Sequence, residues 1–115
     1  MRHYKVLRAT SITNDLDLIE QHLTESYQSF GEDPENAMDR AAARIEEALE
    51  YLRTFATHPH RGTEYPTIRP GIRTVINKSF IFYFEIDEAS SEVRHLAIFF
   101  SGANHRRQIM DRLRN

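Results

Sequence analysis

The feature that most limits the fold of this chain is the run Phe80–Asp87, which is apolar on both faces if it forms a β-strand. Successive side chains of a strand point to opposite sides of the sheet. One face then carries Phe80, Phe82, Phe84 and Ile86, and the other carries Ile81 and Tyr83. We expect the first face to pack on helices. The second face is strongly apolar and aromatic, so we expect it to be an interaction surface.

Two further strand-like segments flank this run, and short turns separate all three. The segments are Ile72–Asn77 and Val93–Ser101, and the turns lie at Lys78-Ser79 and Glu88–Ser91. Connections this short join antiparallel neighbours, so the sequence predicts a three-stranded antiparallel meander. In the last strand we expect one face to carry Leu96, Ile98 and Phe100, and the opposite face to carry Ala97 and Phe99.

Two amphipathic helices are predicted before these strands. The first has apolar residues at helical spacing, at Ile12, Leu16, Ile19, Leu23, Tyr27 and Phe30. Thr10, Ser11 or Thr13 can cap its start, Asp15 and Asp17 suit its first turn, and Gly31 ends it.

The second helix has a clear start signal, because Asp33 can cap it and Pro34 suits its first position. It ends before Pro59. Its apolar stripe is Met38, Ala41, Ala42, Ile45, Leu49, Leu52 and Ala56. The short link through Gly31 predicts an antiparallel hairpin. Six residues should be buried together with Phe82 or Phe84, namely Leu16, Ile19, Leu23, Ile45, Leu49 and Leu52.

The complete pattern predicts an α+β fold. It consists of an N-terminal strand at His3–Arg8, the helical hairpin, the meander and a short basic helix at Asn104–Arg114. A chain of 115 residues is close to the commonest domain size, so we expect residues 1–115 to form a single domain. No repeat or low-complexity tract interrupts it.

Composition and charge narrow the functional classes. The chain has no cysteine, no apolar signal segment at its start and no run of membrane-spanning length, so we expect a cytoplasmic protein that does not enter a membrane. Residues 1–57 carry six Lys/Arg against eleven Asp/Glu, a net −5, and residues 58–115 carry nine against six, a net +3. This balance disfavours a dedicated nucleic-acid binder but leaves a basic patch that can meet an acidic partner.

The candidate binding site centres on the loop Tyr65–Arg73. Two prolines and Gly71 make this loop rigid, and it places Arg69 and Arg73 beside the aromatic strand. Guanidinium groups bind phosphates or carboxylates through forked donors. We expect partner binding by Arg69, Arg73, Tyr83, Phe99, Arg106 and Arg107. The alternatives are that the loop arginines pair with the acidic helices, and that Tyr83 and Phe99 are plain core.

Catalysis is a second alternative. Ribonuclease chemistry needs a cation, a base and an acid around one phosphate. The candidates are Arg73, His95 and Tyr83, and further ones are Arg94, His105 and Glu85. These residues come from different strands and faces. His58 and His60 are too few for a metal site. We therefore predict no metal and no cofactor.

The chain resembles the RelE/ParE superfamily of bacterial toxins over nearly its whole length. The segments that carry the resemblance are Tyr4-Lys5-Val6, Asp15–Ile19, His58-Pro59, Ile68–Arg73, Phe80–Tyr83 and Gly102-Ala103. The order Arg-Pro-Gly-apolar-Arg followed by apolar-Phe-Tyr looks specifically like the ParE branch.

The resemblance implies the toxin of a type II toxin–antitoxin pair, of the kind associated with plasmid stabilization. A ParE-like toxin is neutralised by a cognate antitoxin and acts by binding DNA gyrase. One alternative is a ribosome-dependent mRNA endonuclease like those of the RelE branch. ParE-like chains commonly carry His-Gly-Ala-Arg-Asp after the last strand, where this chain has Ser101–His105. A non-toxic interaction module with the same fold is therefore a further alternative.

Overall fold

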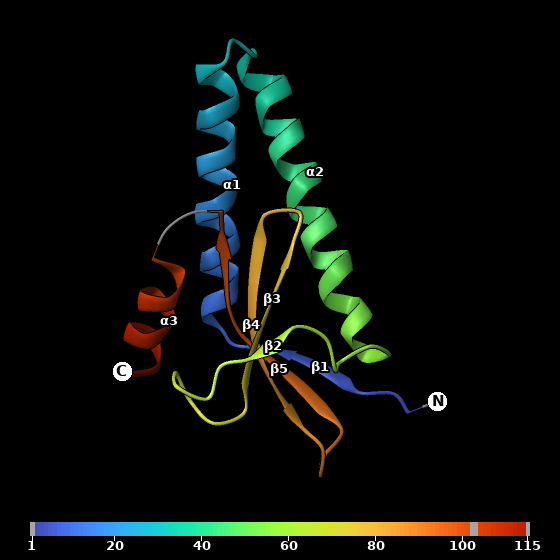
Figure 1. Ribbon diagram of the computed structural model, residues 1–115. Coiled ribbons are helices and arrows are strands. Elements are labelled where there is room, and N and C mark those ends of the chain that lie inside the picture. The colour runs from blue at the N-terminus through green and yellow to red at the C-terminus, as the bar shows by residue number, and fades with distance from the viewer. Residues whose placement is uncertain (1, 102–103, 115) are drawn as a thin grey trace.

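The protein has an α+β fold, as predicted, in which a helical hairpin packs on a five-stranded sheet (Figure 1). The computed structural model describes residues 2–101 and 104–114. Its elements in chain order are β1 (Lys5–Arg8), α1 (Ser11–Ser29), α2 (Pro34–Arg53), the 3-10 turn η1 (Thr54–Ala56), β2 (Thr63–Glu64), β3 (Ile72–Asn77), β4 (Phe80–Asp87), β5 (Glu92–Phe100) and α3 (His105–Arg114). None of the helices in the described residues is long and apolar enough to cross a membrane.

The strand order is β1-β5-β4-β3-β2. The strands β3, β4 and β5 form the predicted antiparallel meander, and β1 adds in parallel beside β5. The terminal elements are within one or two residues of their expected bounds, but the two-residue strand β2 was not predicted. It pairs with β3 through Thr63 and Glu64, which are exposed and carry no apolar pattern to reveal them.

The start of α2 and the end of α1 have the predicted local chemistry, but the start of α1 does not. The side chain of Asp33 accepts a hydrogen bond from the backbone N–H of Asn36, and Pro34 opens α2. Thr10 precedes α1 without a side-chain cap, and neither Asp15 nor Asp17 belongs to its first turn. Gly31 has a φ of 101°, the left-handed conformation that lets the chain leave α1.

The apolar stripes were predicted with errors at their edges. Phe30 was expected inside but is 87% exposed, because the closed end of the hairpin projects beyond the sheet (Figure 1). Met38 and Ala42 are also exposed. The buried stripe of α2 consists of Ala37, Ala41, Ile45, Ala48 and Leu52. Alanines on this face bring α2 close to α1, and Leu49 is only half-buried.

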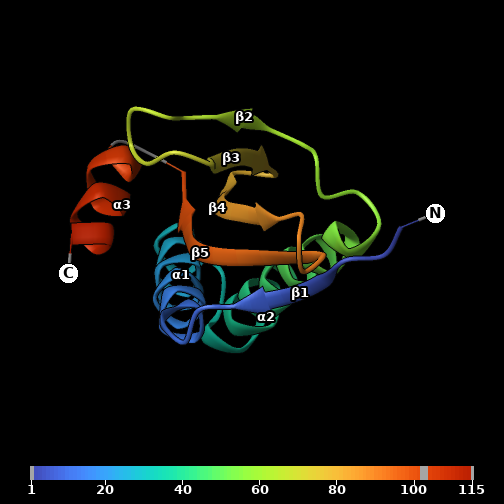
Figure 2. The same cartoon turned by 90° about the horizontal axis from the view of Figure 1, so that it is seen from below.

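The main core lies between the hairpin and one face of the sheet (Figure 2). As predicted, Leu16, Ile19, Leu23, Ile45 and Leu52 are buried together with Phe82. Arg44 closes the edge of this core, since its guanidinium lies 5.5 Å from the ring centres of both Phe80 and Phe100. It also donates to the carbonyl of Lys78 at 2.6 Å.

A bulge between β4 and β5 changes which residues share a face. Tyr83 pairs with Ala97 but Phe84 pairs with His95, so Leu96 is an extra residue in β5. Leu96 was expected beside Ile98 on the helix side. It packs instead with the cluster on the opposite face.

The opposite face is covered by the chain's own elements. We define the aromatic face as Ile81, Tyr83, Ala97 and Phe99. The first three are buried, beneath Ile109 and Leu113 of α3 and beneath Tyr65 and Ile68 of the preceding loop. In Figure 2 the loop runs along the top of the view, the hairpin lies at the bottom, and α3 stands at the left beside the end of the sheet.

The two leucines Leu23 and Leu18 of α1 provide a matched test of this packing. Leu23 is 3% exposed and Leu18 is 58% exposed. Leu23→Ala should lower the free energy of unfolding by about 2–5 kcal/mol, the usual cost of truncating a core leucine. Leu18→Ala should change it by less than about 0.5 kcal/mol. Urea unfolding of both variants measures the difference, and equal losses would contradict the orientation of α1.

Candidate functional site

Tyr83 lies at the centre of the aromatic face and is fully buried. Its hydroxyl is 2.7 Å from Nδ1 of His105, the first residue of α3. Burial raises the pKa of Tyr83 and lowers the pKa of His105. The two groups therefore meet as a neutral pair, and Tyr83 holds the start of α3 in place.

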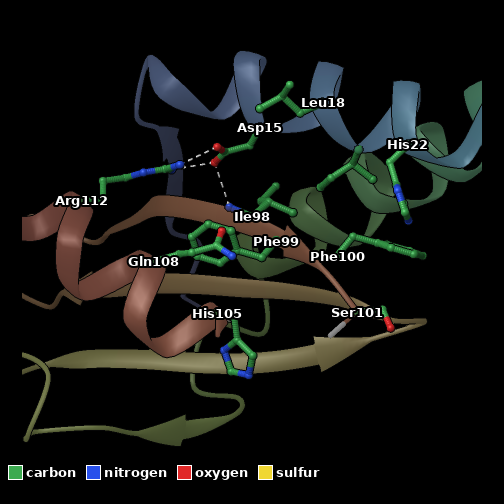
Figure 3. Close-up of a pocket in the computed structure, with 11 residues that line it drawn as sticks. Asp15, Leu18, His22, Ile98, Phe99, Phe100, Ser101, His105, Gln108 and Arg112 are labelled. Carbon is green, nitrogen blue, oxygen red and sulfur yellow. Dashed lines mark hydrogen bonds and ion pairs between the residues drawn. The ribbon is translucent and has the colours of Figure 1, made fainter. Parts of the chain in front are cut away.

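An ion pair holds the other end of α3. Arg112 donates to both carboxylate oxygens of Asp15 in α1, at 2.6 and 2.7 Å (Figure 3). The same carboxylate accepts the backbone N–H of Ile98 in β5 at 3.0 Å. Arg112 also lies over the ring of Phe99 at 5.3 Å. One carboxylate thus ties together α1, β5 and α3.

Sequence reasoning missed this role of Asp15. It was interpreted as a first-turn carboxylate, but it is only 5% exposed. The signal was present in the helix periodicity, since Asp15 lies three residues after Ile12 and four before Ile19, on the buried stripe of α1. A carboxylate at such a position needs a cation, and the basic tail helix supplies it.

Beside this ion pair is a groove of about 290 Å³ between α1, the end of β5 and α3. Ile98, Phe99 and Phe100 form its inner side, with Leu18 and His22 on the α1 wall and His105 and Gln108 on the α3 wall (Figure 3). Of the two aromatic residues in the predicted binding site, Phe99 is half-buried beside this groove, whereas Tyr83 is fully buried beneath α3 and the loop.

The loop arginines have partners within the chain. Arg69 contacts Glu85 of β4 at 2.5 Å. Arg73 contacts Glu64 of β2 at 3.0 Å and donates to the carbonyl of Arg61. These carboxylates belong to the sheet and not to the acidic helices that the sequence suggested as the alternative. The contacts fix the loop across β2, β3 and β4.

The arginines of α3 differ in their environment. Arg106 donates to the Tyr65 hydroxyl at 2.7 Å and lies over its ring at 4.4 Å. Arg107 is exposed and has no ion pair or hydrogen bond within residues 2–101 and 104–114. Tyr83, Phe99 and Arg106 therefore come together around α3, while Arg69 lies in the loop before β3 and Arg73 lies in β3 itself.

The candidate nuclease residues do not converge. His95 is fully buried on the helix side of the sheet, with its ring centre 4.5 Å from that of Phe55, whereas Tyr83 packs on the opposite side. Burial lowers the pKa of His95 to about 3, and neither ring nitrogen has a partner in the described part of the chain. Arg94 is paired with Asp87 and Glu92.

The two loop histidines have separate partners. His60 lies 2.7 Å from Glu88, and His58 lies 2.9 Å from the hydroxyl of Thr57. Among the residues that the structure describes, no three histidines, aspartates or glutamates are grouped as metal ligands would be.

The sequence matches no protein-family model and no curated protein. Solved structures with the same fold include the following two. A chain of the chromosomal ParDE TA system from P. aeruginosa matches with a TM-score of 0.67 at 18% identity, over 87% of this chain and 98% of that one. A chain of the toxin–antitoxin complex RelBE2 from Mycobacterium tuberculosis matches with a TM-score of 0.57 at 13% identity, over 86% and 99%.

The chain therefore has the fold seen in these ParDE and RelBE2 chains. This is the fold expected from the sequence segments that resemble the RelE/ParE superfamily. Gly102 and Ala103, the last of those segments, lie outside the described residues.

The Asp15–Arg112 pair should contribute measurably to stability. Asp15→Asn keeps the shape and an acceptor for Ile98 but removes the charge, so it should lower the free energy of unfolding by roughly 2–3 kcal/mol, less than for a fully buried pair because Arg112 is partly exposed. Arg53→Gln breaks the exposed pair with Glu46 and should cost at most about 0.5 kcal/mol. Denaturant titration compares the two, and equal effects would contradict the proposed importance of Asp15.

His95 should make the fold sensitive to acid. The unfolded chain binds a proton at this histidine below about pH 6.5, whereas the folded protein does so only below about pH 3. The contribution of His95 to the free energy of unfolding is therefore fully present above about pH 6.5. It falls by up to about 1.4 kcal/mol per pH unit from there toward pH 3. His95→Leu should remove this part of the slope. The check is urea unfolding of both proteins at several pH values, and parallel curves would contradict the burial of His95.

Proposed function

We propose that this protein is the toxin of a type II toxin–antitoxin pair, and that it acts in the cytoplasm by binding DNA gyrase. A cognate antitoxin neutralises it. The observation that carries the proposal is the fold likeness to chains of two toxin–antitoxin systems, each covered over nearly its whole length. The ParE-like arrangement of the loop Ile68–Arg73 and the strand Phe80–Tyr83 supports the gyrase target.

Binding has more support than catalysis as the mode of action. Cleavage of RNA needs its cation, base and acid around one phosphate. His95 and Tyr83 lie on opposite sides of the sheet and are both buried, and the Arg73 guanidinium is engaged by Glu64. A ribosome-dependent endonuclease is therefore the less supported candidate.

The proposed partner surface surrounds α3 and the loop before β3. Phe99 offers an apolar contact within the groove, and Arg106 and Arg107 of α3 and Arg69 of the loop supply cationic groups outside the groove lining. Tyr83 supports this surface indirectly, because it holds His105 in place. Arg73 supports it by holding the loop in place through Glu64. An acidic, partly apolar segment that orders on binding suits such a surface, since apolar contact gives affinity and the arginines set its position.

The proposal predicts a specific pattern of toxicity. Induced expression in a bacterial host should stop growth and trap gyrase on broken DNA, while cellular mRNA stays intact. Co-expression of the product of the adjacent reading frame should restore growth and yield a complex with this protein.

Each part can fail separately. Defined cuts in ribosome-bound mRNA, with no trapped gyrase, would favour the endonuclease. Normal growth together with a stable complex would favour a non-toxic interaction module. Absence of any complex with the adjacent product would contradict the toxin–antitoxin proposal itself.

A further inference from the structure

The C-terminal half of β3 is an edge of the sheet with which no other strand pairs in the described residues. The strand β2 pairs with β3 only at Thr63–Thr74 and Glu64–Arg73. In the hairpin with β4, the N–H and C=O groups of an antiparallel strand alternate between its two sides. The closing pair of this two-residue turn is Asn77–Phe80. The backbone N–H and C=O groups of Val75 and Asn77 therefore point toward β4, whereas those of Ile76 point away from it. Within the described residues, no backbone hydrogen bond joins Ile76 to another segment on that outer side.

Gly62 explains why β2 stops short of Ile76. Its φ is 76°, and a Cβ atom there would lie 2.2 Å from the carbonyl oxygen of Thr74. The chain thus turns away from β3 at a glycine pressed against the edge. The carbonyl of Arg61, the next residue toward the N-terminus, accepts from Arg73 Nε at 3.1 Å. The cover of the edge therefore ends beside Thr74.

The side chain of Ile76 does not protect this edge. Natural edge strands avoid pairing with other chains by placing charges, proline or a covering segment there. Ile76 is instead 63% exposed. It pairs with Ile81, which pairs with Phe99, so an apolar row runs from the open edge across β4 to the groove beside α3.

The turn that follows the open edge carries excess cationic charge. Lys78, two residues after Ile76, and Arg44 share the single carboxylate of Glu47, at 2.7 and 4.0 Å. Arg61 does not contribute to this charge, because its guanidinium stacks on Tyr51 and Phe55 and donates to Thr54 and His58. An occupant with an acidic residue beside an apolar one would complement the charge at Lys78. A second copy of this chain would bring the cations of two edges together.

We propose that an extended acidic segment of the antitoxin pairs with β3 at Ile76 and adds a strand to the sheet. The N–H and C=O groups of Ile76 give backbone hydrogen bonds, its side chain gives the apolar contact, and Lys78 receives a flanking carboxylate. This inference rests on the proposed function. It adds the position and the backbone conformation of the partner, on a part of the sheet that α3 and the loop leave open.

Amide hydrogen exchange followed by NMR tests the backbone pairing without a substitution. In the free protein the Ile76 amide should exchange much faster than those of Val75 and Asn77, which bond to β4. In the complex with the product of the adjacent reading frame, the Ile76 amide should be protected at least about tenfold. Unchanged exchange at Ile76 in a stable complex would overturn the inference and leave the proposed function intact. If no complex forms, both are overturned.

Substitutions test the same contact by affinity. Ile76→Pro removes an outward N–H that the fold does not use, and edge strands tolerate proline at such positions. It should weaken the complex about tenfold or more, and Ile76→Thr, which keeps the N–H, should weaken it less. Met38→Gln changes an equally exposed apolar residue on α2 and is the matched control. Equal affinities for all three variants would overturn the inference. A concentration-dependent dimer of the free protein that Ile76→Pro abolishes would assign the edge to a second copy instead.

Discussion

The structure depends on one constraint, which is that β4 is apolar on both faces and must be covered twice. All five residues from Phe80 to Phe84 are buried. The hairpin supplies one cover, with a broad contact lined by leucines, isoleucines and alanines. The second cover is much smaller and consists of α3 and the loop before β3. A ten-residue helix is too short to be stable by itself, so its position is decided by tertiary contacts.

Those contacts are chiefly polar at both ends of α3 and apolar between them. His105 meets Tyr83 at the start, Arg112 meets Asp15 near the end, and Ile109 is fully buried in the middle. The Asp15 carboxylate would be costly without its cation, since burial removes it from water. The apolar contact supplies attraction, while the two polar contacts fix where along the sheet α3 lies. The groove beside Phe99 follows from that placement.

Most of the fold could be predicted because its signals are local. Asp33 and Pro34 mark the start of α2, and the alternation in Phe80–Asp87 marks a strand, whatever surrounds them. The errors concern residues whose surroundings are decided by distant parts of the chain. Phe30 has the correct spacing for a core residue but lies where no sheet reaches, and the bulge at Leu96 shifts its side chain to the other face. Of the candidate site residues, Arg106 and Arg107 are exposed and Phe99 is half-buried, so they stay a prediction of partner binding, whereas the burial of Tyr83 under α3 required the tertiary structure.

The edge of β3 stays exposed because of where the two covers of the sheet end. The loop that covers the aromatic face must cross β3, and it does so through β2, which Gly62 stops beside Thr74. The hairpin covers only the other side of the sheet, so neither cover reaches the outer edge at Ile76. An edge with free backbone groups and an exposed apolar side chain is a liability in a protein that acts alone. The proposed antitoxin strand would remove this liability by completing the sheet. The same segment, Gly62 to Arg73, thus fixes the loop arginines on one side and limits the cover of β3 on the other.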